Sequence, residues 1–195
     1  MKLKLSKNLR RICYDVLINI FPVMIGVYLG IHFNNKNEDR KQEELKKKVI
    51  ASLITESENN LKVLQTSLAY FEQLKDSTSN PKSTEKSPSS FSFWKGLNPP
   101  EELSSTAFEV AQITNTLTNM KVETLQSLSE VYTGQENLKE QSNTYIQSMT
   151  DKIGSKDFTN SFYYTFLFNY AYDQVLTEKG LIQDMEQLLS KLKQE

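Results

Sequence analysis

The stretch ICYDVLINIFPVMIGVYLGIHF, residues 12–33, decides how the rest of the chain is organised. As an α-helix rising about 1.5 Å per residue it is roughly 33 Å long, which matches a bilayer hydrocarbon core of about 30 Å. No Lys or Arg lies between Arg11 and Lys36, and the one charged side chain inside the stretch, Asp15, lies within a turn of its N-terminal end. We therefore expect one transmembrane helix over residues 12–33.

Four polar or small residues share one face of this expected helix. Asp15, Asn19, Gly26 and Gly30 follow one another at steps of four, seven and four residues. Glycines four residues apart allow two helices to approach closely, and polar groups in lipid need partners. The pattern predicts a helix–helix interface, with a second copy or with a membrane-protein partner. The alternative is that Gly and Pro are simply common in membrane helices and that Asp15 and Asn19 reach interfacial water.

The flanks of the apolar stretch favour an uncleaved signal anchor. Residues 1–11 carry five basic side chains and no acidic one, and no Ala-x-Ala-like cleavage site follows the apolar stretch. Residues 34–48 carry six basic and four acidic side chains, so the two flanks are nearly equal. Because a long C-terminal domain is translocated largely regardless of charge, we expect residues 1–11 in the cytoplasm. Residues 34–195 then lie in the periplasm or outside the cell, anchored to the inner (plasma) membrane and its lipid.

Charge and cysteine content exclude several classes of function. The net charge of −1 conceals an acidic C-terminal part, because residues 49–195 sum to −7. An acidic domain is a poor nucleic-acid binder, since attraction to phosphate needs a basic surface. The one cysteine, Cys13, lies in the apolar stretch, so residues 34–195 have no thiol for a disulfide or a metal site.

The chain after the apolar stretch is expected to begin with a stalk helix over residues 34–75. Apolar residues recur there at steps of three and four, and Ser57 and Asn60 weaken the stripe in its middle. The membrane helix is expected to run into this helix without a loop. Residues 37–48, NEDRKQEELKKK, can form ion pairs between side chains four residues apart.

A loop rich in Ser and Pro is expected over residues 76–104. It contains three aromatic residues, Phe91, Phe93 and Trp94. In a polar loop, such a cluster either fastens the loop to the neighbouring helices or contacts a partner.

Residues 105–195 are expected to form an antiparallel helical bundle that packs on the stalk, so the predicted fold class is all-α. A capping box from Thr106 to Glu109 predicts a helix of about four turns, followed by a break near Lys121. A longer helix then runs to about Asp151, with Gly134 allowing a local irregularity.

The end of the chain is expected to hold two more helices. Residues 154–157 form a break, and the aromatic stretch DFTNSFYYTFLFNYAYDQVLTEKG follows. Its aromatic residues fit helical spacing and also strand-like alternation, and its length and its helical neighbours favour a helix. Gly180 is expected to end this helix, and a last helix follows over residues 181–192.

The residues at the end of the apolar stretch resemble a known signature. Gly26 to Lys41, GVYLGIHFNNKNEDRK, is similar to the signature of a bacterial family of uncharacterised single-pass membrane proteins. His32 stands where that family usually has Gln, and Lys36 where it has Trp. The resemblance implies a helical domain anchored in a Gram-negative envelope, and it brings no activity.

No pattern typical of an enzyme occurs in the chain. The only histidine, His32, lies at the edge of the apolar stretch, and the nucleotide-binding and zinc-protease motifs are absent. The acidic pairs Glu56/Glu58 and Glu101/Glu102 are expected on solvated surfaces. We therefore expect a protein without catalytic residues or cofactors that acts as a structural or interaction subunit of a cell-envelope complex. The alternative is an extracytoplasmic sensing module that signals through a partner.

Overall fold

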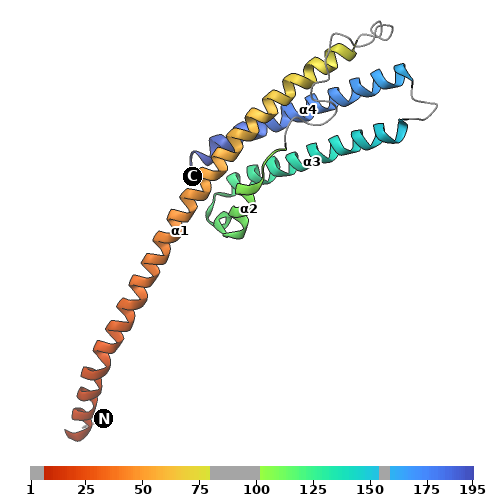
Figure 1. Ribbon diagram of the computed structural model, residues 1–195. Helices are drawn as coiled ribbons and strands as arrows, with labels where there is room; N and C mark the ends of the chain where they lie inside the picture. The colour runs from red at the N-terminus through yellow and green to blue at the C-terminus, as the bar shows by residue number, and fades with distance from the viewer. Residues whose placement is uncertain (1–6, 80–101, 154–158) are drawn as a thin grey trace, which may run out of the picture. The chain divides into compact units, whose positions relative to one another are not determined.

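The computed structural model describes residues 7–79, 102–153 and 159–195, without the side chains of residues 7–17, 19 and 160. These residues form the helices α1 (Lys7–Thr78), α2 (Thr106–Ile113), α3 (Val122–Lys152) and α4 (Asn160–Leu192), and the 3-10 helix η2 (Thr116–Asn119), labelled in Figure 1 where space allows. No strand occurs in these three ranges, which confirms the all-α prediction. The chain divides into two compact units, Met1–Lys47 and Lys48–Glu195, and the boundary falls inside α1.

In the first unit, α1 continues without a break past Phe33, as predicted. The charged segment forms the expected pairs between neighbouring turns. Arg40 Nε lies 4.0 Å from Glu44 Oε1, and Lys41 Nζ lies 3.6 Å from Glu38 Oε1. Pairs of this kind stabilise a solvated helix by a few tenths of a kcal/mol each, so this turn of α1 is suited to water.

The apolar part of the first unit is exposed on all sides of the helix. From residue 18 to residue 33, eleven large apolar side chains are solvent-exposed: Ile18, Ile20, Phe21, Val23, Met24, Ile25, Val27, Tyr28, Leu29, Ile31 and Phe33. Among the residues that the structure describes, no helix contains a segment with the length and the hydropathy needed to cross a membrane. The transmembrane helix over residues 12–33 is therefore not supported here and stays a prediction.

In the second unit, α3 and α4 are antiparallel to each other, and α4 is antiparallel to α1. Figure 1 shows these helices side by side, and side-chain hydrogen bonds fix their directions. Residue numbers rise along one helix as they fall along its neighbour. Between α3 and α4 the pairs are Ser127–Lys191 and Ser142–Gln174. Between α1 and α4 they are Ser67–Glu178 and Glu58–Lys193, in which Lys193 is the C-cap of α4. The predicted helical bundle is confirmed.

The core of the bundle follows alternating steps of three and four residues, which is the spacing of a coiled coil. On α4 the buried residues at this spacing are Leu167, Ala171, Gln174, Glu178, Leu181, Met185, Leu188 and Leu192, and Tyr170, Val175 and Leu189 are buried beside them. On α3 they are Thr124, Leu128, Val131, Gln135, Leu138, Ser142 and Met149, and Ser127 and Tyr132 are buried beside them. Polar side chains thus occupy core positions in the middle of both helices.

These polar positions separate two apolar clusters. One cluster gathers Val49, Leu53 and Leu64 of α1 with the first half of α3 and the last part of α4. The other gathers Tyr70, Phe71 and Leu74 of α1 with residues 170, 171 and 175 of α4. Ser67 of α1 and Glu178 of α4 lie between the clusters in sequence, and Gln174 directly precedes Val175 of the second cluster. All three are almost fully buried.

The predicted four-turn helix that starts at Thr106 is wrong. Helix α2 ends at Ile113, Asn115 adopts a left-handed φ of 56°, and η2 follows. Because the chain turns there, Ile113 is 84% exposed and not part of the core. The capping box is wrong as well, since the N-cap is Ser105, whose Oγ donates to Glu109 Oε1 at 2.6 Å and caps no backbone N–H. The break near Lys121 is confirmed, because α3 begins at Val122.

The two glycines of the bundle do not interrupt their helices. The helix end predicted at Gly180 is wrong, because α4 continues through it to Leu192. Glycine costs about 1 kcal/mol in a helix, and the burial of Leu181, Met185 and Leu188 just beyond it outweighs that cost. Gly134 causes no irregularity either. A Cβ at Gly134 would lie 2.9 Å from Leu181 Cδ1, so the glycine lets α4 pack closely on α3. The predicted break over residues 154–157 lies outside the described residues.

Candidate functional site

The residues predicted to form a helix–helix interface lie on α1 in the first unit. A Cβ built on Gly26 or on Gly30 meets nothing within 4 Å, so the glycine face is open in the described residues. Asp15 and Asn19 belong to the same helix, and their side chains lie outside the described part of the structure. His32 is exposed and stacks on Tyr28, with ring centroids 6.3 Å apart.

The predicted partner contact formed by Phe91, Phe93 and Trp94 also lies outside the described residues. The segment that follows it, residues 102–105, belongs to the second unit and packs against α1 through Ser104. There it meets a polar site that no sequence motif predicts.

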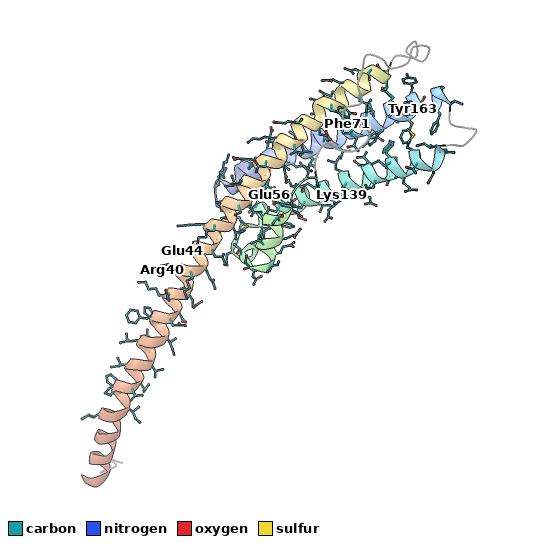
Figure 2. All side chains as sticks on the ribbon, viewed as in Figure 1. Arg40, Glu44, Glu56, Phe71, Lys139 and Tyr163 are labelled. Carbon is teal, nitrogen blue, oxygen red and sulfur yellow. The ribbon has the colours of Figure 1, made fainter. Side chains whose placement is uncertain are left out.

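This polar site is centred on the carboxylate of Glu56, which is labelled on α1 in Figure 2. Glu56 is only 8% exposed. Its Oε1 accepts a hydrogen bond from Tyr132 Oη at 2.6 Å, and its Oε2 accepts from Ser104 Oγ at 2.7 Å and from the Ala107 backbone N at 2.8 Å. Ala107 lies in the first turn of α2, where backbone N–H groups have no partner within the helix. A side chain of α1 therefore caps α2.

Asn60, one turn further along α1, fastens the same segment. Its Nδ2 donates to the Ser104 carbonyl at 2.8 Å, and its Oδ1 accepts from the Ser104 N–H at 2.9 Å. Burial, together with the hydrogen bond to Glu56, raises the pKa of Tyr132 far above its usual value of 10. Tyr132 thus stays a neutral donor across the physiological range.

The solvated surface expected for Glu56 is wrong, because the segment 102–107 covers it. For Glu58 the expectation is confirmed: its side chain is 47% exposed and pairs with Lys193 at 3.2 Å. Glu102 is exposed too, and Glu101 lies outside the described residues. One signal in the sequence pointed to this site. Glu56 and Asn60 stand where the three- and four-residue steps of α1 place core residues, next to the weakened stripe noted at Ser57.

A second polar group crosses the core between the two apolar clusters. Ser67 Oγ of α1 donates to Glu178 Oε1 of α4 at 2.5 Å, and Gln174 Nε2 donates to Ser142 Oγ of α3 at 3.1 Å. All four side chains are almost fully buried. Polar groups at core positions of a coiled coil fix register at a cost in stability, so this layer sets the alignment of α1, α3 and α4.

A pocket of about 560 Å³ opens between α2, α3 and the segment that precedes α2. Its more buried lining comprises Leu103, Phe108, Tyr132, Gln135, Leu138, Ser142 and Ile146, and its exposed rim comprises Glu102, Glu109, Gln112, Glu136, Lys139 and Asn143. The rings of Phe108 and Tyr132 stack at 4.1 Å with an interplanar angle of 8°. Small-molecule sites have this volume and this kind of mostly apolar lining.

One ion pair crosses the rim of the pocket. Lys139 Nζ, labelled in Figure 2, donates to Glu102 Oε1 at 2.5 Å. The hydrogen bond and the charge of each partner lower the pKa of Glu102 and raise the pKa of Lys139. Both side chains stay mostly solvated, so the pair closes the rim only loosely.

Deeper in the pocket, Gln135 is 8% exposed, and its amide Nε2 has no hydrogen-bond partner among the described residues. Buried amide groups are nearly always hydrogen-bonded, and an unmade bond costs the full desolvation of the group. This nitrogen has almost no exposed surface of its own, so it does not face the open volume of the pocket.

Within the described ranges, no three His, Cys, Asp or Glu side chains are grouped so that they could hold a metal ion. Comparison of the whole chain with family models, with curated proteins and with solved structures gives no match. The resemblance to a family of single-pass membrane proteins therefore stays a prediction.

Proposed function

We propose that this protein is a membrane-anchored helical interaction subunit of a cell-envelope complex and that it acts without catalysis. The proposal places residues 12–33 in the inner membrane, residues 1–11 in the cytoplasm and residues 34–195 outside the cytoplasm. The helical bundle then presents its surface to other envelope proteins.

The observation that carries the proposal is the sheath of eleven exposed apolar side chains between residues 18 and 33. Monomeric proteins rarely leave a contiguous apolar surface of this size in water. A helix that is apolar all round needs lipid or protein on every side. The neighbouring segment 37–48 is charged and self-paired, which suits the water next to a bilayer.

The glycine face of the same helix supports a partner in the membrane. Gly26 and Gly30 lie on one side of α1, and no atom occupies the space where their side chains would be. In lipid, close backbone approach through small residues is a main source of helix association. The proposed partner is a second copy or a membrane helix of another subunit.

Membrane extraction tests the anchor. The full chain is expected to stay in the membrane pellet after alkaline carbonate washing. The double variant Val23→Lys/Val27→Lys is expected to leave it, because each Lys near the middle of a span costs about 2.5–3.5 kcal/mol. The control Ile113→Lys/Val122→Lys changes two exposed apolar residues of the second unit and should stay in the pellet. Wild-type protein in the wash would overturn the proposal, and a C-terminal reporter active in the cytoplasm would overturn its orientation.

Cross-linking tests the interface. Gly26→Leu/Gly30→Leu is expected to abolish a cross-linked dimer or heteromer in native membranes, because the new side chains hold the helices apart. Val27→Leu, which lies between the two glycines on another side of the helix, should leave the cross-link intact. Equal cross-linking in both variants would contradict a glycine-mediated contact.

A second candidate function is a sensing module, and the pocket lined by Gln135 favours it. A structural subunit needs no pocket of this volume with a stacked aromatic pair in its wall. Stabilisation of the full chain against heat by a small molecule would support this candidate.

A further inference from the structure

The surface of α4 that points away from α1 and α3 has no role in the core or in the pocket. Phe168, Tyr172 and Leu176 follow one another there at steps of four residues. Tyr172 is 47% and Leu176 is 56% exposed, and Phe168 is half-buried. Tyr172 and Leu176 each lie two residues from Gln174 of the core, and successive residues of an α-helix are about 100° apart, so both lie on the far side of the helix. We call the surface formed by Thr165, Phe168, Asn169, Tyr172 and Leu176 the outer face of α4.

Two aromatic rings of this face are already ordered. The rings of Phe168 and Tyr172 stack with their centroids 6.1 Å apart and an interplanar angle of 26°. A side chain that is held in place before binding loses little conformational entropy when a partner covers it. Tyr and Phe are also enriched in the buried centres of protein interfaces. The outer face of α4 therefore has the composition and the order of an interface.

The outer face of α4 also carries no charge. Over residues 161–178 the only charged side chains are Asp173 and Glu178, and neither is exposed. Tyr145 Oη donates a hydrogen bond to Asp173, and Ser67 Oγ donates one to Glu178 at 2.5 Å, so both carboxylates are bound within the bundle. Helix α3, by contrast, exposes charged side chains along its length. The outer face of α4 therefore gives a strongly charged partner nothing to pair with.

We infer that the outer face of α4 binds the same face of a second copy of this chain. A two-fold axis brings the residues near it close to their own copies, so any charge there would meet a like charge. A face without charge avoids that repulsion. Apolar side chains at steps of four form a ridge, and the ridges of two identical helices can interdigitate. Tyr172 and Leu176 of one copy then pack against Phe168, Tyr172 and Leu176 of the other.

The size of this face indicates that the contact needs the membrane. Residues 161–178 form a helix face roughly 27 Å long and about 10 Å wide. Stable dimers bury about 800 Å² per partner, which is well above the area of such a face. Once the anchors of two copies are paired in the membrane, the contact between their bundles is intramolecular, with an effective concentration roughly in the millimolar range. The inference thus rests on the proposed membrane anchor, and it selects the second copy from the two partners proposed for the glycine face.

Cross-linking of the full chain in native membranes tests the contact. Every variant also carries Cys13→Ser, so that one introduced cysteine is the only thiol of the chain. Tyr172→Cys and Leu176→Cys are each expected to give a homodimer with a short bis-maleimide, identified by co-expression of two copies with different tags. Thr133→Cys, at an exposed position of α3, is the matched control and should give none.

Three results would overturn the inference. If Tyr172→Cys reacts with a mono-maleimide but forms no homodimer, the face is open and no second copy binds it. If it reacts with neither reagent, even after solubilisation in detergent, another part of the chain covers the face. If Thr133→Cys cross-links with equal yield, the product reflects random collision. Carbonate extraction of the same membranes separates a failed contact, in which the protein stays in the pellet, from a failed anchor.

A pair of opposite charges distinguishes the contact from a folding defect. In the Tyr172→Cys background, Leu176→Glu places like charges near the two-fold axis and should lower the yield of homodimer by about tenfold. Co-expression with a Leu176→Lys copy should restore the yield, because the two charges are then opposite. Thr133→Glu should leave it unchanged. Full cross-linking of Leu176→Glu, or no recovery with Leu176→Lys, would show that the two faces do not meet.

Discussion

Replacing Glu56 by Gln tests whether one carboxylate holds α2 and its preceding segment on the bundle. Gln keeps the shape and replaces one oxygen by a donor. If the amide oxygen takes the place of Oε2, it still accepts from Ser104 and Ala107. The amide nitrogen then faces Tyr132 Oη, and the hydroxyl proton of Tyr132 loses its acceptor.

The magnitude follows from the three hydrogen bonds. A bond to a charged group contributes about 1.5–3 kcal/mol and a neutral one about 0.5–1.5, so three bonds weaken by about 3 kcal/mol in total. The uncharged Gln costs about 1 kcal/mol less to bury than the carboxylate, and this offsets part of the loss. We expect Glu56→Gln to lower the free energy of unfolding by about 2 kcal/mol. For a chain of this size the melting temperature should fall by about 4–8 °C.

The assay combines urea unfolding, followed by circular dichroism, with hydrogen exchange read by mass spectrometry. The Ala107 amide donates to Glu56 at 2.8 Å, so its exchange reports directly on the contact. A loss of about 2 kcal/mol speeds exchange roughly 30-fold at this site. Amides in the middle of α3 serve as the internal reference.

Glu58→Gln is the matched control. It makes the same change two residues away on α1, where the carboxylate is exposed and pairs with Lys193. Exposed pairs contribute about 0–1 kcal/mol, so a change below about 0.5 kcal/mol is expected. If the two variants are equally stable, or if Ala107 exchanges at the same rate in both, the carboxylate does not cap α2.

Three more predictions concern the bundle. Gly180→Ala should raise the free energy of unfolding in urea by about 0.5–1 kcal/mol, because no atom lies within 4 Å of the new Cβ. Gly134→Ala should raise it by less, because the Leu181 side chain must move to make room. An equal gain in both variants would contradict the close approach of α3 and α4. Gln174→Leu should leave the free energy of unfolding unchanged or raise it by about 1 kcal/mol, because Gln174 Oε1 is buried without a hydrogen-bond partner among the described residues. A free energy of unfolding more than about 1 kcal/mol below that of the wild type would show instead that the polar layer is stabilising. The pKa of Tyr132 is higher in the folded than in the unfolded chain, so its contribution to stability is complete below about pH 10 and is lost as the pH rises further. The free energy of unfolding, measured from about pH 9 to about pH 12, should therefore fall less steeply in Tyr132→Phe than in the wild type. Parallel curves for the two proteins would refute this.

Much of the fold is predictable from residue spacing. The steps of three and four along α1, α3 and α4 indicate helices, and the aromatic stretch before Gly180 is helical from Asn160 onward, as its length and its neighbours favour. Ends of helices are less predictable. Gly180 looks like a C-cap in sequence, but the buried residues that follow it keep α4 intact.

The spacing of residues alone does not predict the candidate site. Sequence placed Glu56 on a helix and favoured a solvated surface for it. Only the approach of Ser104, Ala107 and Tyr132, which lie 48 to 76 positions away in the chain, makes it buried and hydrogen-bonded. Gln135 likewise occupies a regular core position of α3, and nothing local marks its amide as unsatisfied.

The sequence by itself determined the all-α class, the apolar character of residues 12–33 and the paired charges that follow them, because each depends on neighbours within a turn or two of helix. The tertiary structure decided which polar side chains are buried, where α3 and α4 come closest and where the pocket opens. Those features depend on contacts between distant segments, and their free energies come from burial and from hydrogen bonds that no local pattern records.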